Sequence, residues 1–243
     1  MSLTRFSPQV VKAFGLPAAE PAALLRLAAP WFALALAAHA GRGLPFPGSQ
    51  IAALVVSAIA VGLFGHAWQR FAATGERPAG PVVLVLGWRA FAWAGAYQLM
   101  LGFEGAVATL LGIVLEGVAN AHALAFAGTQ LFQLLFGPML LLLPHLALAR
   151  RGEGKASLAE MVAAGGLAVG LGYVLVNLPF LFVTLAWADV AVQLPDGPAF
   201  TFAAGVVQYL VSFLGLAVSA GYFGLVWTEL RDTVTPLAAR KPE

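Results

Sequence analysis

Six long apolar runs occupy most of this 243-residue sequence. A membrane-spanning helix needs about 20 mostly apolar residues, because all its backbone polar groups must be satisfied inside the segment. The runs lack the polar–apolar alternation of outer-membrane strands. They predict an all-α, polytopic membrane helical bundle with six transmembrane helices: Ala22–Ala40, Ile51–Trp68, Val82–Glu116, Ala121–Leu148, Leu158–Ala188 and Phe200–Leu230.

The composition supports a surface that faces lipid. Charged residues make up 10% of the chain and hydrophobic residues 60%, whereas soluble domains carry about a quarter charged residues. The net charge of +2 and the lack of a strongly basic stretch argue against nucleic acid as a partner. The absence of cysteine excludes disulfides, thiolate catalysis and cysteine metal sites. Richness in Ala, Gly and Leu suggests a high-GC bacterium, so we expect the cytoplasmic (inner) membrane.

The distribution of basic residues predicts the orientation of the six helices. With both termini in the cytoplasm, twelve of the thirteen Lys and Arg residues fall on the inner side and only Arg42 falls outside, as the positive-inside rule expects. Trp68 and Arg70 then suit the inner headgroup level. We expect one domain over 1–243, with an interfacial N-terminal helix (1–21), the bundle (22–230) and a cytoplasmic tail (231–243). A cleavable signal peptide over 1–40 is the alternative.

Small residues and prolines predict how the helices pack and bend. Gly166 and Gly170 in the fifth run, and Gly215 and Ser219 in the sixth, have the four-residue spacing that permits close helix packing. The helix surfaces that carry these small residues are expected to pack the fifth helix against the sixth, or to form the interface of a dimer. Prolines at 138, 144 and 179 should bend helices or free carbonyl groups, and Asn177 beside the last proline could pair with such a group.

A few polar residues inside the runs are candidates for a binding site, because ionisable groups are costly within a membrane. Glu104 is the deepest carboxylate by linear position, and Glu116 lies near the outer end. Gln130 and Gln133 share one helical face. The apolar stretch from 90 to 117 is about 42 Å long as a helix, longer than the hydrocarbon core. Tilt, a break near Gly102 or Gly105, or protrusion would accommodate it.

The four histidines form two pairs, His39 with His122 near the outer surface and His66 with His145 near the inner one. Such pairs suggest a bis-histidine haem protein. However, His122 and His145 are about 34 Å apart along one helix, at the membrane boundaries. We therefore expect interfacial histidines and no metal or other cofactor. No nucleophile elbow, HExxH motif or protease-like aspartate pair is present, so no catalytic site is recognisable.

Three segments carry a resemblance to known proteins: AWQRFAATGERP (67–78), GWRAFAW (87–93) and YFGLVWTELRD (222–232). They resemble uncharacterised six-span bacterial inner-membrane proteins, similar to the membrane domain associated with glycerophosphodiester phosphodiesterases. The resemblance implies a six-helix inner-membrane bundle and carries over no catalytic residue.

Three functions are compatible with the sequence. The favoured one is a membrane-embedded helper that binds or assembles other components, with the lipid bilayer, other membrane proteins or a second copy of the chain as partners. The alternative is a permease for small solutes or lipids that uses the kinked fourth and fifth helices. A haem-binding redox protein is the third. A polar cavity at mid-depth that contains Glu104 and Asn177 would favour the permease.

Overall fold

The computed structural model describes residues 3–43, 47–76, 87–149, 155–193, 195 and 197–238. These residues are helical apart from short turns. The elements are α1 (Ser7–Ala19), α2 (Pro21–Ala40), η1 (Gly41–Gly43), α3 (Ser49–Thr74), α4 (Trp88–Val114), α5 (Ala121–Phe136), η3 (Gly137–Leu141), α6 (Leu142–Leu148), α7 (Lys155–Ala191) and α8 (Pro198–Ala238).

Six helical segments among the described residues are long and apolar enough to cross a membrane, which confirms the predicted number. One of them, Ala121–Leu148, comprises α5, η3 and α6 in succession. With α1, the chain thus has seven helical segments in its described part. The six are Pro21–Ala40, Ser49–Thr74, Trp88–Val114, Ala121–Leu148, Leu158–Ala191 and Ala199–Thr233.

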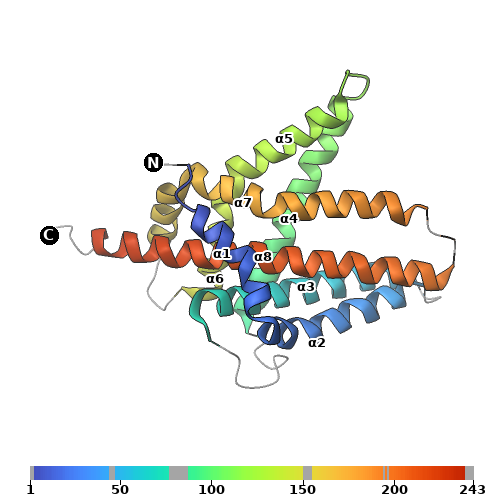
Figure 1. The fold of residues 1–243 in the computed structure, drawn as a ribbon, viewed down its shortest axis with the longest axis horizontal. Coiled ribbons are helices and arrows are strands. Elements are labelled where there is room, and N and C mark those ends of the chain that lie inside the picture. The colour runs from blue at the N-terminus through green and yellow to red at the C-terminus, as the bar shows by residue number, and fades with distance from the viewer. Residues whose placement is uncertain are drawn as a thin grey trace.

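Four of the long helices, α2, α3, α8 and α7, lie side by side with nearly parallel axes (Figure 1). The hairpin of α4 and α5 diverges from them, so that its tip stands away from the C-terminal part of α7 and the N-terminal part of α8 (Figure 1). The helix α4 runs unbroken from Trp88 to Val114, through Gly102 and Gly105. A change of direction, and not a break at either glycine, therefore accommodates the extra length of the third run.

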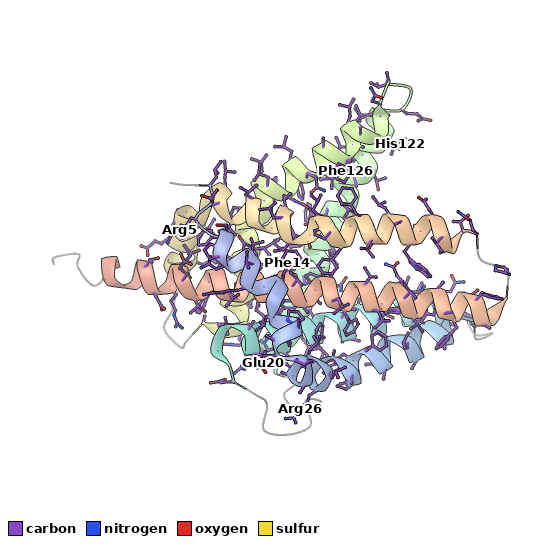
Figure 2. The ribbon with its side chains drawn as sticks, viewed as in Figure 1. Arg5, Phe14, Glu20, Arg26, His122 and Phe126 are labelled. Carbon is purple, nitrogen blue, oxygen red and sulfur yellow. The ribbon has the colours of Figure 1, made fainter. Side chains whose placement is uncertain are left out.

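The short helix α1 lies obliquely across α7 and α8 (Figure 1). The ring of Phe14 stacks on Phe180 with centroids 6.3 Å apart. Arg5 forms an ion pair with Glu229 at 3.4 Å, and Gln9 donates a hydrogen bond to the same carboxylate. Figure 2 shows Arg5 and Glu20 at the two ends of this oblique segment. A short N-terminal helix is thus present, and its place at the membrane surface remains a prediction.

Large aromatic side chains form the centre of the bundle. Trp68, Trp93, Trp227 and Tyr222 are almost fully buried. The indole of Trp68 donates to the carbonyl of Ala217 at 2.7 Å, which ties α3 to α8. The expectation of Trp68 at the headgroup level remains a prediction, but the side chain packs inside the bundle and does not face its surroundings. Its indole is buried between two helices, where burial of its large ring and a backbone hydrogen bond both stabilise the fold.

Two of the apolar helices are interrupted. Between α5 and α6 the chain tightens into the five-residue 3-10 segment η3, with Pro138 in its first turn. In α7 the interruption is at Gly166, whose φ of 48° and ψ of −148° are not helical. Pro179 lies inside α7 as well, but the non-helical residue of α7 is Gly166. The fourth and fifth spans are thus bent, although in the fifth a glycine provides the break.

Small residues allow close approach at several helix crossings. A side-chain carbon added to Gly170 would overlap the backbone of Leu134 in α5. One added to Gly172 would overlap the ring and hydroxyl of Tyr222 in α8, and one added to Gly215 would press on Phe180 in α7. The predicted packing of the fifth helix against the sixth is present through Gly172 and Gly215, whereas Gly170 faces α5 and Gly166 marks the break.

Candidate functional site

A cavity of about 280 Å³ lies between α3, α4, α5, α7 and α8. Its walls include Glu104 from α4, Gln133 from α5, and Tyr173 and Asn177 from α7. Each of these residues lies well inside one of the long apolar helices. The structure therefore brings together three of the residues that the sequence singled out, Glu104, Gln133 and Asn177, near the middle of the bundle.

Glu104 is the acceptor at the centre of this site. The hydroxyl of Tyr173 donates to its Oε1 at 2.7 Å, and Nε2 of Gln133 donates to its Oε2 at 3.2 Å. Three helices thus meet at one carboxyl group. Both hydrogen bonds are made inside the bundle and join α4 to α5 and to α7. The sequence did not point to Tyr173, because a single tyrosine in an apolar run is as compatible with simple packing as with a polar site.

Asn177 pairs with α8. Oγ of Ser219 donates to its Oδ1 at 2.8 Å. The sequence suggested that the amide would satisfy a carbonyl freed by Pro179. Instead it joins two helices at the wall of the cavity, and Ser219 is a lining residue as well as a packing residue.

A second polar pair lines the cavity on the side of α3. Nε1 of Trp93 donates to Oε1 of Gln69 at 2.6 Å, and the ring of Trp93 stacks on Tyr97 at a centroid distance of 5.3 Å. Gln69 is completely buried. The sequence did not point to Gln69, because it lies one residue before Arg70, in a segment expected at the solvent-exposed inner end of the helix.

Three amide atoms in the cavity wall have no hydrogen-bond partner among the described residues. They are Nε2 of Gln69, Oε1 of Gln133 and Nδ2 of Asn177, the last of which lies beside Tyr173. Buried polar atoms are nearly always paired, because leaving one unpaired costs about 1–3 kcal/mol. Two donors and one acceptor on residues that line one cavity therefore make this part of the interior polar.

Glu104 is the one carboxyl side chain among the described residues that line this cavity, and none of those described residues is a Lys, Arg or His. A ligand that brings positive charge or hydrogen-bond donors would complement the carboxylate, whereas an anion would be repelled.

A second cavity, of about 430 Å³, adjoins the first. The two share wall residues, among them Tyr97, Asn177 and Ser219. The second cavity extends toward Arg42, Ser57 and Tyr209, at the end of the bundle where α3 and α8 begin. The second cavity thus lies between the Glu104 site and that end of the bundle.

The opposite end of the bundle, which we call the arginine end, contains large buried side chains and three arginines. It is the end at which α3, α6 and α8 finish and α4 begins, with Arg70, Arg89 and Arg231. Nη1 of Arg89 donates to the carbonyl of Ala149 at 2.8 Å and ties two of these helix ends together. Trp227 and Leu230 of α8 are buried at this end. The site around Glu104 is thus asymmetric, since the adjoining cavity leads away from the arginine end.

The other predicted polar residues lie elsewhere. Glu116 is exposed in the turn between α4 and α5. Gln130 is half-buried in α5 with both amide atoms unpaired, but it does not line the cavity that contains Gln133. Of the two glutamines on one helical face, one therefore belongs to the site.

The histidines are distributed over four helices. His39 packs edge-on against Tyr209 of α8, whereas His122 lies near the tip of the diverging α4–α5 hairpin (Figure 2). The predicted outer pair is therefore not brought together. His66 is buried in α3 and His145 is half-buried in α6. Within the described ranges, no three His, Asp or Glu side chains form a group that could hold a metal ion.

No family model, curated protein or solved structure matches this chain. The resemblance to the phosphodiesterase-associated membrane domain therefore remains a prediction, and the geometry of the cavity carries the functional interpretation.

Proposed function

We propose that this protein is a permease that binds a small polar solute, or the polar part of a lipid, in the cavity around Glu104. The observation that supports this most is the meeting of Glu104, Gln133, Tyr173 and Asn177 from three helices around one space. A helper protein with a fully apolar interior would not need this arrangement. The proposal therefore favours transport over the helper function.

The chemistry of the wall defines the class of ligand. Glu104 offers acceptor oxygens, Gln69 and Asn177 offer free N–H donors, and Gln133 offers a free carbonyl oxygen. The rings of Trp93, Tyr97, Tyr173 and Phe180 supply an aromatic surface. A carboxylate beside aromatic faces is a suitable environment for an amine or ammonium group. We therefore expect a cationic or hydroxyl-rich ligand of small size.

In this proposal the six apolar helices span the cytoplasmic (inner) membrane of a bacterium, with both termini in the cytoplasm. The arginine end then faces the cytoplasm, in accordance with the positive-inside rule. We propose further that the adjoining cavity at Arg42 faces the outer side, which makes this arrangement a state open outward and closed inward. The bends at η3 and Gly166 are where the fourth and fifth spans would change shape during transport.

Protection of a single cysteine tests whether the cavity binds such a ligand. The chain has no cysteine of its own, so Ser219→Cys in the purified protein would be the one target for the small neutral reagent methyl methanethiosulfonate. We expect ethanolamine or glycerol to slow this reaction at least about threefold, and acetate to have no effect. The Glu104→Gln variant should lose the effect of ethanolamine. If none of these probes slows modification, the proposed binding function is wrong.

The helper function remains the second candidate because of the α4–α5 hairpin. Large apolar side chains on α4 of this hairpin are exposed, including Phe103, Leu110 and Ile113. A partner subunit could occupy this face instead of lipid. Substitution of Phe103 and Ile113 by alanine should then release a co-purifying protein, whereas a permease without a partner would keep its protection by ethanolamine.

A further inference from the structure

The arginine end contains a further cleft, of about 440 Å³. None of the described residues lines both this cleft and the Glu104 cavity. Arg70 from α3, Arg89 from α4 and Arg231 from α8 all line it, together with Trp227. These arginines are distant in sequence, and the fold brings them to one concave surface.

The described residues that line the cleft carry more positive than negative charge. Glu76 is the one acidic residue among its described lining residues. It pairs with Arg70 at 3.4 Å, and its side chain is 69% exposed, so the pair is weak and screened. Arg231 contacts Asp232 at 3.5 Å, outside the lining. The nearby Glu229 interacts with Arg5 and Gln9 of α1. Three guanidinium groups thus face one carboxylate in the lining.

An unpaired donor adds to this pattern. Trp227 is 1% exposed, and its Nε1–H has no acceptor among the described residues. The guanidinium of Arg231 lies 5.0 Å from the centre of the Trp227 ring. Arg89 uses Nη1 to hold the carbonyl of Ala149, which fixes its position at the edge of the cleft. The cleft therefore offers many donors and few acceptors.

We propose that this cleft binds a phosphate group. Guanidinium groups bind phosphate oxygens through paired hydrogen bonds, and arginine is preferred for this purpose. The phosphate could belong to an anionic lipid headgroup, since basic pockets between helix ends on the cytoplasmic side bind such headgroups, or to a soluble phosphate.

A titration with two phosphate sources tests the proposal on the full-length protein. Delipidated protein in neutral detergent is titrated with short-chain phosphatidylglycerol and, separately, with inorganic phosphate, and binding is followed by native mass spectrometry and by the midpoint of thermal unfolding. We expect saturable binding of at least one of them. Tighter binding of phosphatidylglycerol assigns the site to a lipid, and equal or tighter binding of inorganic phosphate assigns it to a soluble ligand.

Matched arginine variants distinguish this site from general attraction to a basic surface. Arg70→Gln and Arg231→Gln should each raise the dissociation constant about tenfold, the effect of losing one charge-assisted contact. Arg26→Gln removes the same charge from α2, at an exposed position outside the cleft, and should change it less than about twofold. If the Arg70→Gln variant does not fold, the dissociation constant of the Arg231→Gln variant is compared with that of the Arg26→Gln control instead. Equal effects of cleft and control variants, or no saturable binding, would overturn the proposal.

Discussion

Glu104 shows how one carboxyl group can organise three helices. It lies on α4, and its hydrogen bonds come from Gln133 on α5 and Tyr173 on α7. The sequence was sufficient to identify Glu104 and Asn177 as polar residues inside apolar runs. It was not sufficient to predict Tyr173 or Gln69 as their neighbours, because this depends on the rotation of each helix about its own axis, and helices surrounded by lipid show no clear polar face.

Tyr173→Phe should lower the free energy of unfolding by about 1–3 kcal/mol, since it removes a hydrogen bond to a buried carboxyl group. In the Glu104→Gln background the loss should be smaller, because the two residues interact directly. Unfolding in mixed detergent micelles, followed by circular dichroism, measures all four proteins.

The matched control is Tyr209→Phe, which removes a hydroxyl that donates to Ser57 at 2.9 Å, away from Glu104. Its effect should be the same with and without Glu104→Gln. Additive losses for Tyr173 and Glu104 would show that the hydrogen bond seen here does not contribute to stability.

At the scale of elements, the sequence predicted six apolar helices and bends in the fourth and fifth of them, and the structure contains both. The sequence predicted that Pro179 would bend the fifth helix or free a carbonyl group, whereas the non-helical residue of α7 is Gly166. A proline can remain inside a helix when the carbonyl that it frees is satisfied or tolerated, whereas Gly166 adopts a backbone conformation that other residues avoid.

Gly170→Ala tests the close contact between α7 and α5. Because an added carbon would overlap the carbonyl oxygen of Leu134, and backbone cannot yield as a side chain does, we expect a loss of about 1–3 kcal/mol in the free energy of unfolding. Gly102→Ala in α4 is the control, since no heavy atom lies within 4 Å of its added carbon. Thermal unfolding of the two purified variants should therefore separate them clearly. Equal midpoints would contradict the observed packing.

At the scale of the whole molecule, the sequence predicted which helix ends lie together but not the arrangement in space. The positive-inside rule grouped Arg70, Arg89 and Arg231 at one end, and the structure places all three around a single cleft. The divergence of the α4–α5 hairpin was not predictable, because residues 90–117 read equally well as a tilted, broken or protruding helix. Its direction depends on contacts with α3, α6 and α7, which no local pattern encodes.

The central proposal is that a polar cavity, with Glu104 as the one carboxyl group of its described lining, is open to the outer side of the membrane. It is tested most directly by the rate at which membrane-impermeant reagents modify Ser219→Cys in intact cells. The cationic trimethylammonioethyl methanethiosulfonate is compared with the anionic sulfonatoethyl reagent, and Glu76→Cys at the arginine end is the control for sidedness. Glu104→Gln controls for the charge.

We expect Ser219→Cys to react from outside, and Glu76→Cys to react only after the cells are permeabilised. The ratio of cationic to anionic rates at Ser219→Cys should fall about tenfold when Glu104 becomes glutamine, as the loss of one nearby charge at low dielectric predicts. A cysteine at 219 that neither reagent reaches, or a ratio that does not depend on Glu104, would contradict the account.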